Sequence, residues 1–244
     1  MTMYKVLVNG RSCNGGDLVW SLPRQRPDGS WEAGAWHEVG GPIQVCRNGL
    51  HLTRHPVEWW KRGAECYVAE YEGDTDEDRD GLKIAVRRAR LLRRLTTEEL
   101  AALGIWREGH HRVTAGRAIA YGSTSVEASG SASVEAYDSV SVVASGSASV
   151  EASDSVSVVA YGSASVRAYD SASVVASDSA SVKASGSASV VSMYGEPAVT
   201  VRNRAVWIDR RHDTPVIHAV AAELVLHPGS LEQSAPRERE GEEA

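Results

Sequence analysis

Apolar and polar positions alternate strictly through residues 122–193, which divide into nine octads with one shared pattern. The pattern is Gly or Asp, Ser, Ala or Val, Ser, Val, a variable residue, Ala, then Ser or Tyr. Successive side chains of a β-strand point to opposite faces, so positions three, five and seven face inward and the serines face outward. Gly or Asp at position one fits a corner that needs a positive φ.

The sixth position of each octad shows how many octads form one coil. Its residues fall into two sets, each recurring every 16 residues: Glu135, Glu151, Arg167 and Lys183 in one set, and Glu127, Val143, Val159, Val175 and Val191 in the other. A period of eight would not separate these sets, so two octads form one coil. The pattern predicts a β-solenoid with two sheets and about 4.5 coils, on the order of 22 Å long.

Residues 1–95 have the mixed pattern of a small globular domain. A strand at Tyr4–Val8 ends at the turn residues Asn9 and Gly10, and a second strand is predicted at Glu65–Tyr71. Pro56 fits the first position of a short helix that extends to Arg62.

Charged residues dominate the end of this domain. We predict a solvated acidic loop at 74–80, followed by a strand at 83–94 that carries five arginines. Those arginines indicate either an anion-binding edge or the solvent-facing side of a strand. Thr96 and Glu99 then fit a capping box, and Gly104 fits the end of the short helix that they begin.

The predicted fold class is mainly β, with a small N-terminal α/β (α+β) domain followed by a two-sheet β-solenoid of 16-residue coils. Pro197 interrupts the repeat, and Trp207 is a candidate plug for its end. The predicted boundaries are 1–95 for the globular domain, 96–113 for a linking helix and entry segment, 114–193 for the solenoid, 194–229 for a C-terminal cap and 230–244 for a disordered tail.

The composition argues against some classes of binding partner. The net charge of −6 gives no long-range attraction to nucleic acid or anionic lipid, so we expect neither as a partner. No apolar stretch approaches the ~20 residues that cross a bilayer. Three cysteines without framework spacing argue against a disulfide-stapled secreted domain. We therefore expect a soluble cytoplasmic protein, or a virion-associated one if it is encoded by a phage.

The repeat resembles two known groups of proteins. Its 16-residue coil and the run Tyr121–Thr124 are similar to bacterial ice-nucleation proteins, and its Ser/Ala/Gly composition is similar to trimeric adhesin heads. The resemblance implies the architecture and makes ice binding an alternative function. However, the outward rows here are Ser-x-Ser rather than the Thr-x-Thr of ice-nucleation proteins.

The first domain resembles an uncharacterised domain family of phages and bacteria. Three segments carry the resemblance: Cys46–Thr53, Pro56–Trp60 and Tyr67–Asp74. Members often continue into Ser/Ala/Gly-rich repeats, as this chain does, and the resemblance implies no activity.

Candidate chemistry in the first domain is sparse. An ADP-ribosyltransferase is one alternative, in which His51 or Thr53 would hold a nicotinamide cofactor and Glu70 or Glu72 would be catalytic. A metal site would draw on residues whose spacing matches no closed zinc pattern, namely His37, Cys46, His51 and His55. We therefore assign no catalytic residue, cofactor or metal ligand, and the sequence favours a protein that is not an enzyme.

The best candidate sites are surfaces for other proteins. The outward row Val143, Val159, Val175 and Val191 is a continuous apolar ladder, which favours a homo-oligomer formed through this face. Trp59 is a candidate anchor for an unknown protein partner. The sequence thus predicts a structural or interaction protein that uses a rigid solenoid as a spacer or oligomerisation face. An acidic DNA mimic is a further alternative, because acidic residues outnumber basic ones in the repeat.

Overall fold

A computed structural model describes residues 2–13, 17–219 and 224–226, which form two compact units. The first unit comprises Met1–Arg107 with Arg117–Ile119, and the second comprises Glu108–Gly116 with Ala120–Ala244. Strands make up 50% of the structure and helices 5%, so the predicted fold class is confirmed.

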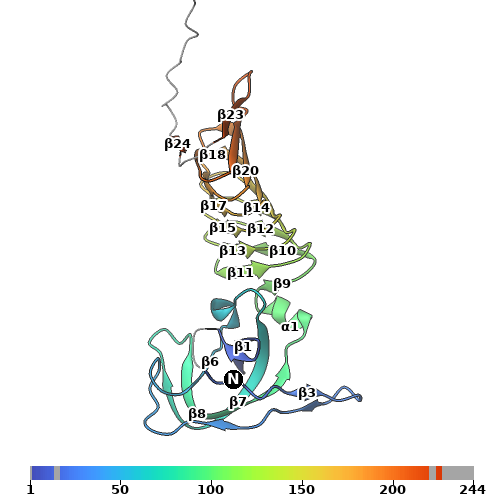
Figure 1. Ribbon diagram of the computed structural model, residues 1–244, viewed down its shortest axis with the longest axis vertical. Helices are drawn as coiled ribbons and strands as arrows, with labels where there is room; N and C mark the ends of the chain where they lie inside the picture. Colours follow the sequence, from blue (N-terminus) through green and yellow to red (C-terminus); the bar gives the residue numbers. More distant parts are fainter. Residues whose placement is uncertain (1, 14–16, 220–223, 227–244) are drawn as a thin grey trace, which may run out of the picture. The chain divides into compact units, whose positions relative to one another are not determined.

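The first unit is built on one antiparallel sheet (Figure 1). Its strand order is β2 (Arg11–Ser12), β1 (Met3–Val8), β7 (Glu65–Glu77), β8 (Ile84–Arg94) and β5 (His37–Glu38), with β6 (Leu50–Leu52) also paired to β8. A separate hairpin joins β3 (Arg24–Gln25) and β4 (Trp31–Glu32). The core lies on one side of this sheet, where Leu7, Leu52 and Leu91 are fully buried.

Most of the turns and helix ends predicted for the first unit are confirmed. Asn9 and Gly10 both have positive φ and form the tight β1–β2 turn. Helix α1 (Thr97–Ala102) begins with the predicted capping box of Thr96 and Glu99. The helix expected from Pro56 to Arg62 is instead a 3-10 turn, η1 (Pro56–Trp59).

The predicted acidic loop at 74–80 was wrong over its first half, because β7 continues through Glu77 beside β8. The pairing brings the β7 carboxylates beside the β8 arginines. Each of the five arginines contacts a carboxylate: Arg87 with Asp74, Arg88 with Glu72, Arg90 with Glu70, Arg93 with Glu99 and Arg94 with Glu65. The strand is therefore charge-neutralised by its neighbours and presents no free anion-binding edge.

The second unit is a stack of coils whose short parallel strands form two sheets. The first sheet runs β10 (His110–Val113), β12 (Ser125–Ala128), β14 (Ser141–Ala144), β16 (Ser157–Ala160), β18 (Ser173–Asp178), β20 (Ser189–Gly195) and β22 (Val206–Asp209). The second contains β13 (Ser133–Ala136), β15 (Ser149–Ala152), β17 (Ser165–Ala168), β19 (Ser181–Ala184) and β21 (Ala198–Val201). The short strands β9 (Ile105–Trp106) and β11 (Arg117–Ala120) precede them in the chain.

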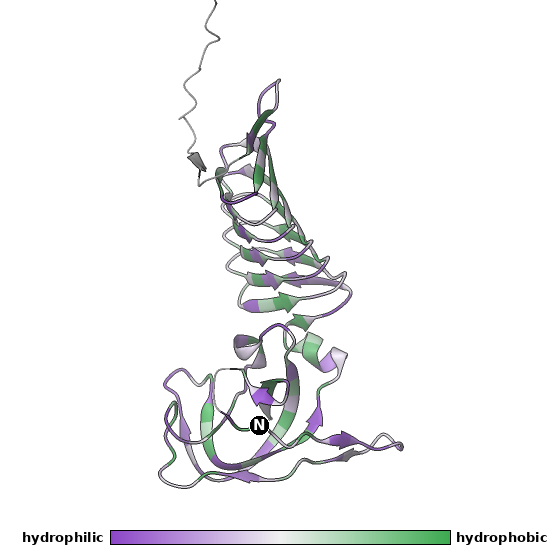
Figure 2. Ribbon diagram, in the orientation of Figure 1, coloured by the Kyte–Doolittle hydropathy of each residue, from purple (hydrophilic) through white to green (hydrophobic). Residues whose placement is uncertain are grey.

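The register confirms the predicted coil of 16 residues. Val143 pairs with Val159, and Glu135 with Glu151, in parallel ladders. The inward residues of the octads are small and almost fully buried. They alternate with outward polar residues, which gives the alternating hydropathy along the coils (Figure 2). Thr124, the one threonine of the nine octads, is also buried, and its hydroxyl donates to the Tyr121 carbonyl at 2.6 Å. Tyr121 stacks on Tyr137 of the next coil at 5.1 Å between centroids.

The solenoid is longer than the octads predict, with about 7 turns rather than 4.5. Strand β10 pairs with β12 before the first octad, although its sequence lacks the repeat. After the last octad, β21 and β22 continue both sheets in coils of 17 residues. Both strands lie in the segment that was expected to be a C-terminal cap. Trp207 on β22 is the buried plug, and its indole nitrogen donates to the Ser192 hydroxyl at 2.7 Å.

Two antiparallel strands cover the C-terminal edges of the sheets. Strand β23 (Val216–Ala219) pairs with β22, and β24 (Leu224–Leu226) pairs with β21. The last parallel strand of each sheet therefore does not present a free edge, and free edges invite aggregation. The tail predicted at 230–244 lies outside the described residues. Within the described residues we find no helix with the length and apolarity of a membrane-spanning segment.

Aspartates at the corners link successive coils through hydrogen bonds. Asp138, Asp154, Asp170 and Asp178 all have positive φ, a conformation that Asp tolerates better than most residues. The Asp154 carboxylate accepts from the Asp138 amide at 3.1 Å, and the Asp178 carboxylate accepts from the Gly162 amide at 3.0 Å. These acids therefore have a structural role in the solenoid.

Replacing Asp154 separates the two parts of this role. Asp154→Ala loses the hydrogen bond and strains the corner, for a cost of about 2 kcal/mol in the free energy of unfolding. Asp154→Gly loses only the hydrogen bond, for a cost of about 1 kcal/mol. Urea unfolding of both variants measures the difference, and equal losses would show that the positive φ contributes nothing.

Candidate interaction face and N-terminal cavity

The predicted valine row exists as a continuous outward ladder on the first sheet of the solenoid. Val143, Val159, Val175 and Val191 are direct partners on successive strands. Val143 and Val159 are 36% and 43% exposed, and the other two are half-buried. Partners on adjacent strands point to the same side, so the four side chains form one stripe.

The structure extends this stripe by two residues that the repeat pattern did not reveal. Val191 pairs with Ile208 on β22, and Ile208 pairs with Ile217 on β23. Ile217 is 65% exposed. We call the six residues Val143, Val159, Val175, Val191, Ile208 and Ile217 the apolar ladder. A signal existed in the alternation of 206–209, but the antiparallel return to Ile217 is a non-local pairing.

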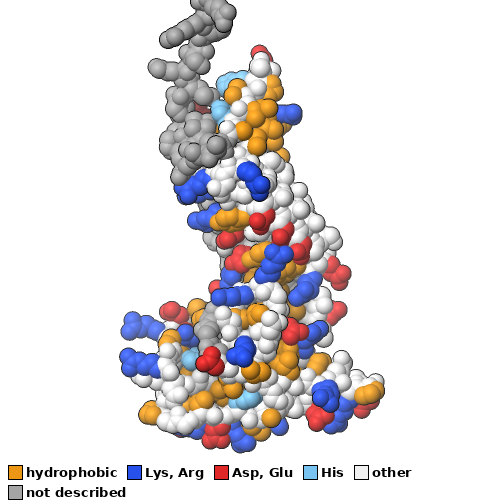
Figure 3. Space-filling view, viewed as in Figure 1, with side chains coloured by type: hydrophobic (Ala, Val, Ile, Leu, Met, Phe, Trp, Pro, Cys, Tyr) orange, Lys and Arg blue, Asp and Glu red, His pale blue; other side chains and the backbone are white. Residues whose placement is uncertain are grey.

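The surroundings of the apolar ladder carry little unpaired charge. Beyond Val143 the next rung is Glu127, which pairs with Arg112 at 2.6 Å. The serine row Ser141, Ser157 and Ser173 runs beside the ladder. In the view of Figure 3, uncharged atoms cover most of the solenoid, with charged side chains scattered among them.

The opposite sheet carries a row of unlike character, which we call the charged column. Glu135, Glu151, Arg167 and Lys183 are direct partners in that order along β13, β15, β17 and β19. Like charges are therefore neighbours at both ends of the column. Among the described residues no ion pair forms between Glu151 and Arg167, although the two are adjacent.

Trp59, the predicted anchor, does not stand on an open surface. Its indole nitrogen donates to the Leu82 carbonyl at 3.2 Å, and the Lys83 ammonium lies 5.1 Å from the centroid of its ring. Trp60, the extended residue that follows η1, is buried. Trp59 instead lines a cavity of the first unit.

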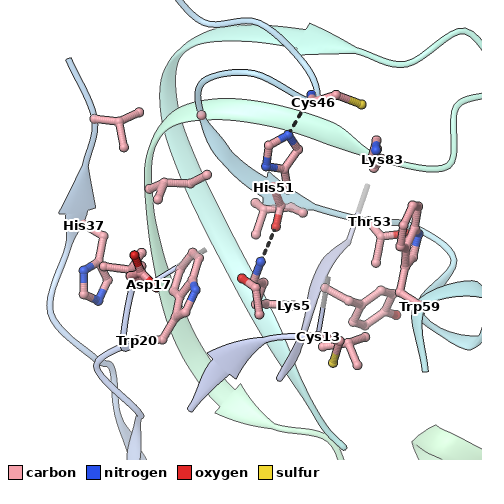
Figure 4. Close-up of a pocket in the computed structure, with 18 of the residues that line it drawn as sticks. Lys5, Cys13, Asp17, Trp20, His37, Cys46, His51, Thr53, Trp59 and Lys83 are labelled. Carbon is pink, nitrogen blue, oxygen red and sulfur yellow. Dashed lines mark hydrogen bonds between the residues drawn. The ribbon is translucent and has the colours of Figure 1, made fainter. Parts of the chain in front are cut away.

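That cavity, which we call the N-terminal cavity, has a volume of about 590 Å³. Pockets that hold small organic ligands measure roughly 300–1,000 Å³, so its size is suitable for one. Its walls come from strands β1, β5 and β6 and from the segment after β2 that contains Asp17 and Trp20 (Figure 4). Its lining includes Lys5, Trp20, His37, His51, Trp59 and Lys83.

Lys5 is the unexpected residue of this cavity. It lies between Met3 and Leu7 on the core-facing side of β1 and is only 6% exposed. Its ammonium donates to the His51 carbonyl at 2.8 Å and lies 5.0 Å from the centroid of the Trp20 ring (Figure 4). Burial lowers the pKa of Lys5 to about 8, because desolvation disfavours the charged form.

The two histidines of the cavity are held in a neutral form. Burial lowers the pKa of His51, and the charges of Lys5 and Lys83 lower it further. Its Nε2 accepts from the Cys46 amide at 3.1 Å. Burial also lowers the pKa of His37, whose Nε2 accepts from the Ser21 amide at 2.9 Å. In each neutral ring the proton therefore sits on Nδ1.

The residues of the ADP-ribosyltransferase hypothesis are not brought together at the cavity. His51 and Thr53 line it, but Glu70 and Glu72 do not. Both carboxylates contact arginines of β8 instead. In the ranges that the structure describes, no group of three or more His, Cys, Asp or Glu residues is placed to hold a metal ion.

Comparison with known proteins finds a match for the first unit but none for the solenoid. Residues 1–103 match the family model described as "Domain of unknown function (DUF7666)". The N-terminal segment is therefore similar to an uncharacterised domain, as its motifs indicated. No curated protein and no solved structure matches the chain.

Proposed function

We propose that this protein is a structural scaffold whose β-solenoid binds a second copy of the chain through the apolar ladder. The observation that supports the proposal is the uninterrupted run of six outward apolar side chains, Val143 to Ile217, on a regular sheet. Contiguous apolar surface of this kind is typical of protein interfaces rather than of free surface.

A second copy fits this face better than an unrelated partner does. The rungs repeat at about 4.8 Å, so a copy related by a two-fold axis sets its own rungs between them. The face spans six rungs along the stack, roughly 29 Å, and about six residues along each strand, roughly 20 Å. That area is on the order of 600 Å², somewhat below the ~800 Å² per partner of a standard interface, so we expect a dimer whose population depends on protein concentration.

The charged column offers a second way to pair copies, and the experiment must separate the two. In an antiparallel pair through that face, Glu135 would meet Lys183 and Glu151 would meet Arg167. This arrangement would relieve the like-charge neighbours within each column. We favour the apolar ladder because exposed ion pairs contribute only about 0–1 kcal/mol each.

Substitution of the ladder with lysine tests the proposal. We expect Val143→Lys/Val175→Lys to weaken dimerisation at least 100-fold, because each copy must then bury two ammonium groups where it buried two valines. Light scattering over a concentration series measures the mass of both proteins. A monomeric unaltered chain at high concentration would contradict the proposal.

The matched control places two lysines on the opposite sheet. Glu135→Lys/Glu151→Lys alters two neighbouring rungs of the charged column and leaves the apolar ladder intact. This variant should dimerise as the unaltered chain does. Loss of the dimer in the control alone would move the interface to the charged column.

The alternative functions stay predictions with distinct tests. Ice binding would follow from the resemblance to ice-nucleation coils and is measured by inhibition of ice recrystallisation. A DNA mimic would compete with DNA for a DNA-binding protein. The corner aspartates, which accept hydrogen bonds from backbone amides, account for four of the acids that suggested such mimicry.

A further inference from the structure

A buried cation without an acidic partner marks the N-terminal cavity as a binding site. Among the described residues no carboxylate lies within ion-pair distance of the Lys5 ammonium, and the one hydrogen bond of that ammonium goes to a backbone carbonyl. By contrast, all five arginines of β8 contact carboxylates although they are more exposed. A buried charge normally has a partner, because desolvation of an unpaired ion is costly.

A second donor of the same cavity also lacks an acceptor. The indole N–H of Trp20 is buried and has no hydrogen-bond partner among the residues that the structure describes, and Trp20 is only 3% exposed. The Lys5 ammonium lies over the same ring, so the two donors are neighbours. Buried donors without acceptors are uncommon in folded proteins and call for an explanation.

The remaining lining suits a ligand that is part anion and part apolar. Lys83 and Arg47 add positive charge, against Asp17 and Glu38. The pKa of His51 is lowered mainly by burial, and the charges of Lys5 and Lys83 lower it further. Leu50, Leu52 and the ring of Trp59 supply apolar surface in the same cavity.

We propose that the N-terminal cavity binds a small organic anion, whose charged group accepts hydrogen bonds from Lys5 and Trp20 while its apolar body lies against Trp59. The ligand class is an aromatic or aliphatic acid with one carboxylate, sulfonate or phosphate group. This site is independent of the solenoid and of its self-association.

Two ligands of nearly equal shape test the role of charge. Naphthalene-1-sulfonate carries a permanent negative charge, and naphthalene-1-sulfonamide is neutral at pH 7. Titration calorimetry of the full chain should show one site at which the sulfonate binds at least tenfold more tightly than the sulfonamide. Equal affinities, or no binding of the sulfonate at millimolar concentration, would overturn the proposal.

Two lysine substitutions locate the site. Lys5→Met keeps the length of the side chain and should abolish the preference for the sulfonate. Lys61→Met is the matched control, because Lys61 is exposed and does not line the cavity. Retention of the preference in Lys5→Met, or its loss in Lys61→Met, would show that the anion binds elsewhere.

The pH profile gives a readout that a purely structural lysine would not produce. The sulfonate remains ionised throughout, so any change between pH 6 and 10 reports on the protein. Because only the protonated amine holds the anion, affinity should be constant below about pH 8 and fall roughly tenfold per pH unit above it. A flat profile would exclude Lys5 as the anion-binding group.

Discussion

We expect deletion of residues 170–177, a single octad, to leave a folded protein that no longer dimerises. Deletion of residues 162–177, a full coil, should leave both the fold and the proposed dimer. The two variants differ by eight residues of almost identical sequence, so only their effect on the outward faces separates them.

The physical reason is that an octad is half a coil. Without residues 170–177, each later strand moves to the opposite sheet while its inward residues still face inward. Lys183 then follows Val159, and Val191 follows Arg167. The apolar ladder is cut into runs of two and three residues on different faces, which cannot form one interface.

The full-coil deletion is the control for loss of length. Without residues 162–177, Val191 follows Val159 directly, and five of the six ladder residues remain in line. In the octad deletion, Asp178 takes the corner position that Asp170 held. Most of the corner hydrogen bonds are therefore conserved in that variant.

Circular dichroism and sedimentation velocity distinguish the outcomes. Both variants should show the β signal of the unaltered chain, and only the full-coil variant should sediment as a dimer. A dimeric octad variant would mean that association does not depend on the continuity of the ladder.

Replacement of Lys5 by Met should stabilise the first unit at neutral pH. The pKa of Lys5 is lowered from 10.5 to about 8 in the folded protein, so the folded state carries a charged group that it disfavours. At about 1.4 kcal/mol per pKa unit this penalty is roughly 3 kcal/mol. Loss of the hydrogen bond to His51 offsets about 1 kcal/mol, which leaves a gain of about 2 kcal/mol.

The sign of the pH dependence follows from proton binding. Between pH 8 and 10.5 the unfolded chain holds a proton on Lys5 that the folded chain has released, so the stability of the unaltered protein rises with pH in this window. The advantage of Lys5→Met should therefore be full below pH 8 and vanish by about pH 10.5.

Urea unfolding at pH 7 and at pH 10 measures this change. Lys61→Met, an exposed lysine in the same unit, should show no such dependence. Destabilisation by Lys5→Met at pH 7 would mean that the contacts of the ammonium with His51 and Trp20 outweigh its desolvation.

The sequence by itself determined the features that depend on local periodicity. The alternation of the octads set which side chains face inward, because a strand has a period of two. The residues at position six set the coil length, because side chains on successive coils must match. Two further features are local: the capping box of Thr96 and Glu99, and the turn at Asn9 and Gly10. Both are present at the predicted positions.

Only the tertiary structure decided the features that depend on non-local pairing. Strands β10, β21 and β22 join the solenoid without the octad, because the end strands of a sheet offer free backbone groups with which a further strand can pair. Ile217 joins the apolar ladder through a chain reversal. The β8 arginines gain partners because β7 runs on beside them. Lys5 occupies a core-facing position on β1, and the cavity around it is made by distant segments.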